Sequence, residues 1–158
     1  MWHDLKKEIA VEREALDRLL SMHHELTVKC ASIPPTHIEI SALSAMLHSF
    51  YTGIENLFKR VAVNLDQGIP RGEMWHSRLL DAMALPTPNR PAVITDDLRD
   101  CLYNYLNFRH VFRHAYAFEL RWSKMAPLVH DCEATFQRVM RELDNFAMAM
   151  DKKSNASG

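Results

Sequence analysis

The chain has 158 residues, of which 47% are hydrophobic and 25% charged, and this composition is typical of one globular domain. It contains only four glycines, where average usage would give roughly eleven. This scarcity excludes Gly-rich phosphate loops of the Walker and dinucleotide-binding types and disfavours a turn-rich β protein. A net charge of −1 excludes a basic coat over the whole surface but leaves room for a local basic patch.

The N-terminal half predicts two long helices. The first covers about residues 4–31, where apolar side chains recur at three- and four-residue steps, and Pro34-Pro35 ends it. The second begins at Thr36, because Glu39 three residues later completes a capping box. It continues in nearly heptad spacing to Gly68, a natural C-terminal stop.

The remaining chain predicts one short and two long helices. Residues 69–95 hold four of the seven prolines and are expected to be irregular, apart from a short helix at about 75–84. The third long helix starts at Thr95, a capping residue followed by two aspartates, and is expected to reach about residue 121. The fourth runs from near Pro127 to about Met150.

These elements predict an all-α protein, an antiparallel four-helix bundle with one short extra helix. We expect a single domain over residues 1–151 and a flexible tail over residues 152–158. The three cysteines are far apart and form no C-x-x-C pair, which indicates reduced thiols and a cytoplasmic protein. No run of 18 apolar residues is present, so no membrane association is expected.

The third long helix departs from a simple amphipathic pattern. On a wheel with Arg109 at 0°, the apolar residues from Leu98 to Phe118 fall between about 180° and 340° and predict the core face. Four polar residues fall at about 0°, 40°, 100° and 140°. They are Arg109, Arg113, His110 and His114. Because Leu102 and Leu106 are interleaved among them, we expect this polar face to be partly buried against a second subunit.

Three interpretations of this polar face are open. Arginines and histidines on an outward face are commonly solvated without a further role. Alternatively, histidine can exchange protons near neutral pH and arginine can bind a phosphate. Cleavage of RNA without a metal needs side chains of these two kinds. His110 and His114 also have the i, i+4 spacing of a metal pair, but Val111 occupies the glutamate position of H-E-x-x-H and no third ligand is evident. We therefore expect neither a metal nor a cofactor.

Residues 109–116, Arg-His-Val-Phe-Arg-His-Ala-Tyr, resemble the motif of the HEPN superfamily, and in particular Arg-x-x-x-x-His-x-Tyr of its HepT-like toxins. Flanking blocks at residues 51–60 and at Trp75-His76 extend the resemblance along nearly the whole chain. The resemblance implies an all-helical homodimer whose two motifs meet in a cleft at the two-fold axis. It also implies a metal-independent endoribonuclease, the toxin of a HEPN/MNT toxin–antitoxin pair. The implied partners are RNA, a second copy of the chain and an MNT-family nucleotidyltransferase antitoxin.

The resemblance also suggests a role for individual residues. Arg109 would bind and polarise the scissile phosphate, and His114 would be the general acid or base. His110 would orient His114 or the substrate, and Arg113, by its charge and facing, would add a second phosphate contact. The antitoxin can transfer AMP to the motif tyrosine, here Tyr116, which the helical wheel places near Arg109.

The roles of three residues outside the motif are less defined. Glu55 on the second long helix is either a supporting carboxylate of the site or part of a surface salt bridge, and Trp75 and His76 are expected to be structural. For the whole protein, the alternatives to a ribonuclease are a catalytically silent HEPN module that binds RNA or nucleotide, and a helical subunit that docks a partner.

Overall fold

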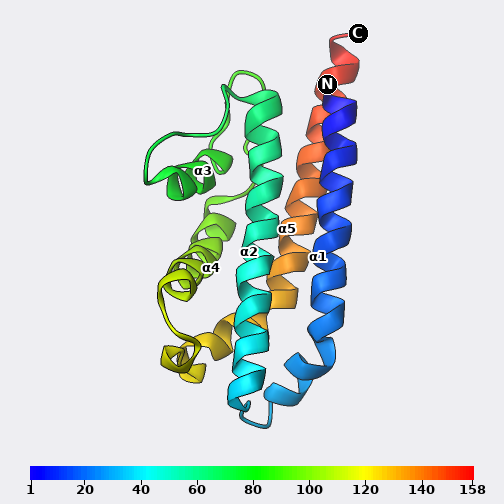
Figure 1. Ribbon diagram of the computed structural model, residues 1–158. Helices are drawn as coiled ribbons and strands as arrows, with labels where there is room; N and C mark the ends of the chain where they lie inside the picture. The colour runs from blue at the N-terminus through cyan, green and yellow to red at the C-terminus, as the bar shows by residue number, and fades with distance from the viewer.

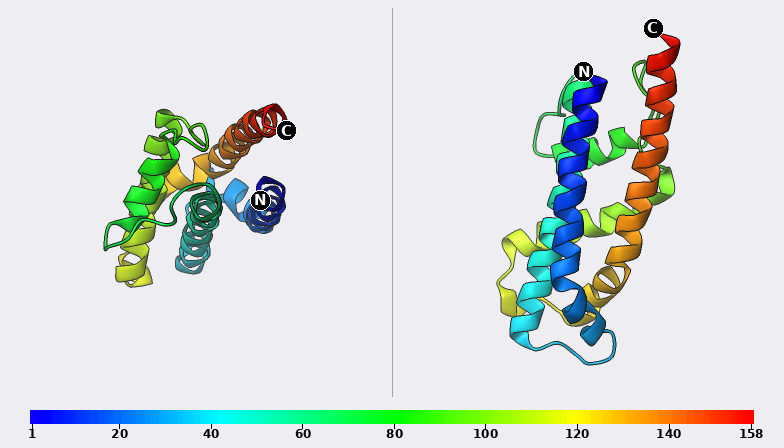
Figure 2. Two further views of the ribbon diagram at one scale, coloured as in Figure 1. Left: turned by 90° about the horizontal axis from the view of Figure 1, so that it is seen from above. Right: turned by 90° about the vertical axis from the view of Figure 1, so that its right-hand side faces the viewer.

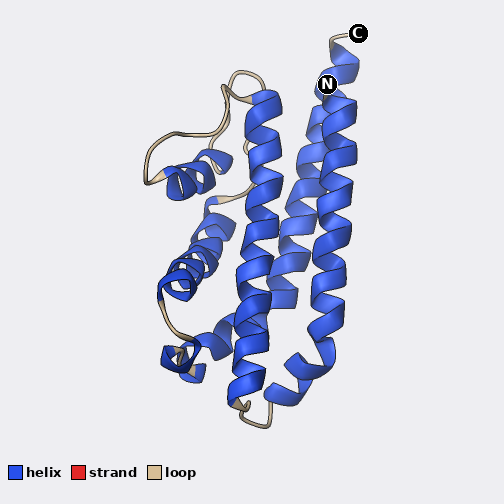
Figure 3. Ribbon diagram, in the orientation of Figure 1, coloured by secondary structure: helices blue, strands red, loops and turns tan.

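A computed structural model describes residues 1–158, with the side chain of residue 117 left aside. The described residues form five α-helices and one 3₁₀ turn, and no strand occurs among them (Figure 3). The elements are α1 (Trp2–Cys30), α2 (His37–Leu65), α3 (Trp75–Met83), α4 (Asp96–His114), η1 (Ala117–Glu119) and α5 (Trp122–Ala156). The all-helical fold predicted from the sequence is therefore confirmed.

The helix α2 is the central element. It packs between α1 and α5 on one side and α3 and α4 on the other, and the top view separates these groups (Figures 1 and 2). Its position explains its sequence: almost every turn of α2 buries apolar side chains, including Phe50, Ile54, Leu57 and Phe58, all at 0% exposure. The helices α1 and α5 run in opposite directions, so both chain termini lie at the same end of the molecule (Figure 1).

The helix starts are those that the capping residues predict. At the start of α2, the amide of Glu39 donates to Oγ1 of Thr36 over 3.2 Å, and the amide of Thr36 donates to the Glu39 carboxylate over 3.0 Å. At the start of α4, the amide of Leu98 donates to Oγ1 of Thr95 over 3.2 Å. Both predicted N-terminal caps are confirmed.

Two predicted helix boundaries near the motif are wrong. The helix α4 ends at His114 rather than near residue 121, because Ala115 adopts an extended conformation with φ −109° and ψ 145°. The helix α5 begins at Trp122, before Pro127, and continues to Ala156. Residues 152–156, expected in the flexible tail, are therefore helical.

The irregular segment between α2 and α4 is fixed by one buried arginine. The guanidinium of Arg90 donates to both carboxylate oxygens of Asp66, each over 2.8 Å. It also donates to the backbone carbonyls of Ala82, Leu85 and Pro91. Because an isolated buried charge is costly, this set of acceptors accounts for a guanidinium that is only 1% exposed. It holds α3 against the central helix.

Candidate functional site: a buried arginine, glutamate and histidine cluster

Glu55 of α2, His76 of α3 and Arg109 of α4 meet in one cluster. The helices α3 and α4 pack on the same side of α2 (Figure 1). Nη1 of Arg109 donates to Oε1 of Glu55 over 3.0 Å. Nδ1 of His76 lies 2.6 Å from Oε2 of the same carboxylate. Each carboxylate oxygen thus has its own partner from a different helix, and the side chain of Glu55 is only 2% exposed. Glu55 is therefore a buried ion-pair partner, not part of a surface salt bridge.

The surroundings of Glu55 are largely buried. Tyr51, one turn earlier on α2, is fully buried, and among the described residues its hydroxyl has no hydrogen-bond partner. Burial, reinforced by the nearby Glu55 carboxylate, raises the pKa of the Tyr51 phenol, so that it stays neutral. Lys59 lies at the partly exposed edge of this cluster. Its Nζ is 4.0 Å from Oε1 of Glu55 and 4.8 Å from the centre of the Trp75 ring. Electrostatic attraction between such buried groups is stronger than at the surface.

A groove of about 290 Å³ opens beside this cluster, between the start of α3 and the second half of α4. We call it the motif groove. It is lined by Glu73, Met74, His76, Ser77, Leu106, Asn107, Arg109, His110 and Arg113. Two arginines and two histidines therefore face one cavity, with Glu73 as the acidic group on its wall. Such a concentration of cationic and imidazole groups suits a phosphate-bearing ligand.

Arg109 lies on the buried face of α4, not on the face away from the core. Leu102, at 0% exposure, and Leu106, at 9%, lie beside it on the helical wheel, at about 20° and 60°. Val111 and Phe118 of the predicted core face are instead 53% and 77% exposed. The predicted core face is therefore correct only in part: Leu98 and Tyr105 are buried as expected, but the buried face is rotated so that Arg109 points toward α2. The two leucines belong to the core and give no indication of a second subunit.

His110 and His114 do face solvent. Both are exposed, and their rings are 4.9 Å apart in an edge-to-face arrangement. His110 lines the motif groove and His114 does not. Within one chain, the structure brings Arg109 together with His110 and Arg113 but leaves His114 outside the groove.

Tyr116 is not on the helix that carries the motif. Because α4 ends at His114, the predicted placement of Tyr116 near Arg109 on one helical face is wrong. Its side chain is 71% exposed, and its ring stacks on that of Phe118 with centroids 5.4 Å apart and planes nearly parallel. It is thus presented to solvent at the turn between α4 and η1.

His76 is the residue of this cluster that the sequence did not identify as functional. It stands in the first turn of α3, and its ring stacks on Trp75 with centroids 3.7 Å apart. One signal was present in the sequence: Glu55 lies between Ile54 and Leu57, in the apolar stripe of its helix. A carboxylate in such a stripe requires buried partners, and a histidine or an arginine elsewhere in the chain is the natural candidate.

His48 extends the cluster along α2. Its ring lies 5.0 Å from that of Phe112, and among the described residues its Nδ1 is buried without a partner. Burial lowers the pKa of His48, and the positive charges of Arg109 and Arg113 lower it further. His48 is therefore held as a neutral ring beside the two arginines.

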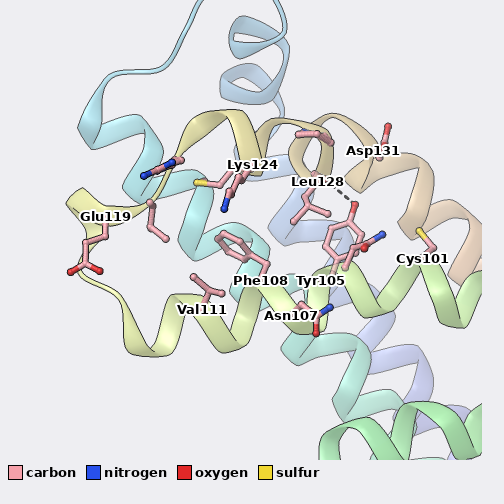
Figure 4. Close-up of a pocket in the computed structure, with 14 residues that line it drawn as sticks. Cys101, Tyr105, Asn107, Phe108, Val111, Glu119, Lys124, Leu128 and Asp131 are labelled. Atoms are coloured by element: carbon pink, nitrogen blue, oxygen red, sulfur yellow. Dashed lines mark hydrogen bonds between the residues drawn. The ribbon is translucent and has the colours of Figure 1, made fainter.

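A second cavity, of about 720 Å³, lies on the other side of α4 (Figure 4). Phe108 and Val111 of α4 face Lys124 and Leu128 of α5 across it, and the hydroxyl of Tyr105 donates to the carbonyl of Leu128 over 2.9 Å (Figure 4). Although this cavity is larger, none of the predicted site residues lines it. Three of the predicted site residues, Arg109, His110 and Arg113, line the motif groove instead.

In the described part of the chain, no three or more His, Cys, Asp or Glu side chains are grouped closely enough to hold a metal ion. None of the described helices has the length and apolar character needed to cross a membrane.

The fold and the cluster together define an all-helical protein with an Arg-x-x-x-x-His motif at the C-terminal end of a core helix, its arginine paired with a buried glutamate. A family model described as HepT-like protein matches residues 42–150, a range that runs from α2 into α5. The chain belongs to this HepT-like family of the HEPN superfamily. No curated protein and no solved structure matches the chain.

Proposed function

We propose that this protein is a metal-independent endoribonuclease, the toxin of a HEPN/MNT toxin–antitoxin pair, acting in the cytoplasm. The observation that carries the proposal is the motif groove, where Arg109, Arg113 and His110 face one cavity. Arginine can bind a phosphodiester through two hydrogen bonds, and histidine can move protons near neutral pH. The family match supports the same class of activity.

In this proposal each residue has a defined role in attack by the ribose 2′-hydroxyl. Arg109 binds the scissile phosphate and stabilises its developing charge, with Arg113 as a second phosphate contact. His114 exchanges protons as general acid or base, and His110 orients it through the edge-to-face contact of their rings. Glu55 supports the site by fixing the direction of the Arg109 guanidinium.

We also propose that the helices form the HEPN four-helix bundle and that two copies associate as a homodimer with their motifs facing. The position of His114 supports this: it is exposed next to the motif groove but does not line it. In a symmetric pair, His114 of a second copy can face the groove of the first, because a two-fold contact uses the same surface on both subunits.

The proposed antitoxin is an MNT-family nucleotidyltransferase that transfers AMP to Tyr116. The exposure of Tyr116, 71%, supports its accessibility to a second protein. An attached AMP adds bulk and negative charge beside Arg113 and His114, which precede Tyr116 by three and two positions. Such a group would repel RNA from the groove.

One observation favours a second candidate, a catalytically silent module that binds RNA or nucleotide. The Arg109 side chain is only 13% exposed and is already paired with Glu55. A guanidinium neutralised in this way attracts a phosphate less strongly. A purely structural arginine would have the same burial and the same carboxylate partner.

Cleavage of RNA in the presence of EDTA separates the two candidates. We expect the purified protein to cut RNA and leave 2′,3′-cyclic phosphate ends, and we expect Arg109→Ala and His114→Ala to abolish cutting. The matched controls are Arg141→Ala and His3→Ala, which remove exposed side chains far from the motif in sequence. RNA binding without cutting supports the silent module, and cutting that EDTA abolishes contradicts the metal-free mechanism.

A further inference from the structure

The contact between Glu55 and His76 determines which ring nitrogen of His76 carries hydrogen. A carboxylate only accepts hydrogen bonds, so the 2.6 Å contact requires a hydrogen on Nδ1. Nη1 of Arg109 lies 3.2 Å from the same Nδ1, and arginine has no acceptor. These two nitrogens are therefore donors that converge on one carboxylate, and they do not bond to each other.

In the neutral form of the ring, this assignment leaves Nε2 with a free lone pair. Among the described residues, no hydrogen-bond contact involves Nε2 of His76. The side chain keeps 24% of its surface exposed and lines the motif groove together with Arg109. A buried carboxylate behind Nδ1 and an accessible Nε2 in front form the arrangement by which enzymes orient a histidine as a base.

We propose that His76, oriented by Glu55, is the general base that removes the proton from the ribose 2′-hydroxyl. This inference rests on the proposed ribonuclease function and adds a residue outside the Arg-x-x-x-x-His motif. Arg109 bonds to the same carboxylate as His76 and lines the motif groove, where the substrate phosphate would bind. One carboxylate thus orients both the base and the phosphate-binding cation.

The 2′-hydroxyl proton moves to Nε2 of His76, and the 2′-oxygen forms a bond to phosphorus. The bond from phosphorus to the 5′-oxygen breaks, and that oxygen takes a proton from the imidazolium of His114. The products are a 2′,3′-cyclic phosphate and a 5′-hydroxyl, and no metal or other reactant is consumed. The positive charge formed on His76 is stabilised by Glu55, which lies 2.6 Å from its Nδ1.

The test uses two oligoribonucleotides in EDTA, one natural and one with the leaving 5′-oxygen replaced by sulfur. A thiolate leaves without a proton, so the sulfur substrate needs a base but no acid. His76→Asn is the key variant, because its amide nitrogen can still donate to Glu55 but cannot take up a proton. We expect it to lose at least about 100-fold in rate on both substrates, since general acid–base catalysis contributes 10²- to 10⁴-fold. His114→Ala should lose as much on the natural substrate and recover on the sulfur one.

His3→Asn is the control for the substitution itself, because His3 is exposed near the N-terminus. Urea unfolding of each variant separates loss of folding from loss of a base. Near wild-type rates for His76→Asn on both substrates overturn the proposal while leaving the ribonuclease function intact. Recovery of His76→Asn on the sulfur substrate alone also overturns it, because His76 would then be the acid. If the wild-type protein cuts neither substrate, the ribonuclease function itself fails and this inference with it.

Discussion

Arg109 and Glu55 are 54 residues apart in the sequence and 3.0 Å apart in the structure, and this ion pair links the motif helix α4 to the central helix α2. Both side chains are largely withdrawn from water, at 13% and 2% exposure. The pair therefore has two consequences. It makes Arg109 part of the core, and it fixes the direction from which the guanidinium faces the motif groove.

Removing Glu55 is expected to destabilise the fold. Glu55→Ala leaves Arg109 and His76 without their common acceptor, and breaking a buried pair typically costs about 3 kcal/mol or more. Glu55→Gln should cost less, because its amide oxygen still accepts one hydrogen bond. Urea unfolding measures both, and in the double variant Glu55→Ala with Arg109→Ala we expect part of the loss to be recovered. Strictly additive losses would show that the two side chains do not interact energetically.

Replacing Arg90 even by lysine is expected to destabilise the fold. Its side chain is fully buried and donates to both oxygens of Asp66 as well as to three backbone carbonyls. Lysine has a single charged nitrogen and cannot reproduce this geometry. We expect Arg90→Lys to cost about 3 kcal/mol, which lowers Tm by roughly 6–12 °C for a chain of this size. A thermal melt within about 2 °C of that of the exposed control Arg141→Lys would contradict this role.

The boundaries that the sequence predicted correctly are those with a local chemical cause. Thr36 and Glu39 exchange hydrogen bonds with each other's backbone amides, and Oγ1 of Thr95 accepts from the amide of Leu98. Each partner lies within three residues, so the sequence alone contains the interaction. The end of α4 at His114 has no such cause, because the next residues are Ala115 and Tyr116 rather than glycine or proline. Its position depends on tertiary packing, which local propensity does not encode.

The buried face of α4 was predicted incorrectly in part for a related reason. Apolar residues lie on most sides of this helix, so periodicity alone did not distinguish buried Leu102 and Leu106 from exposed Val111. The deciding contact is the carboxylate of Glu55 on another helix. Composition and motif therefore pointed to Arg109, His110 and Arg113, which the structure places around one groove, whereas the pairing that positions Arg109 and His76 required the fold.

His48 is expected to make the stability depend on pH. Its pKa is lowered in the folded protein by burial and by the arginines, while the unfolded chain has the ordinary value of about 6.5. As the pH falls through 6.5, the unfolded state takes up a proton that the folded state does not, so the free energy of unfolding falls. Urea unfolding at pH 7.5 and 5.5 should show a smaller loss for His48→Gln than for the wild type. Equal losses in the two proteins would show that His48 does not contribute to the pH dependence.

Gly53 is expected to resist replacement by alanine although it lies inside α2. A helix interior normally gains about 1 kcal/mol from such a change. Here, however, a Cβ at this position would come within 2.5 Å of Cδ2 of Leu16, which is itself buried in the contact between α1 and α2. Overpacking of a filled core costs about 1–3 kcal/mol, so we expect Gly53→Ala to be net destabilising by about 1 kcal/mol.

Leu16, whose side chain the new Cβ would meet, provides the control for Gly53→Ala. Leu16→Ala removes the atoms that the new Cβ would meet, so in that background the clash disappears and the gain in helix propensity remains. Gly53→Ala should therefore change sign, from destabilising in the wild-type protein to stabilising in Leu16→Ala, in a double-mutant cycle measured by urea unfolding. A gain in both backgrounds would mean that Leu16 moves aside at little cost. A loss in both would mean that other atoms than those of Leu16 limit the approach of α1 to α2.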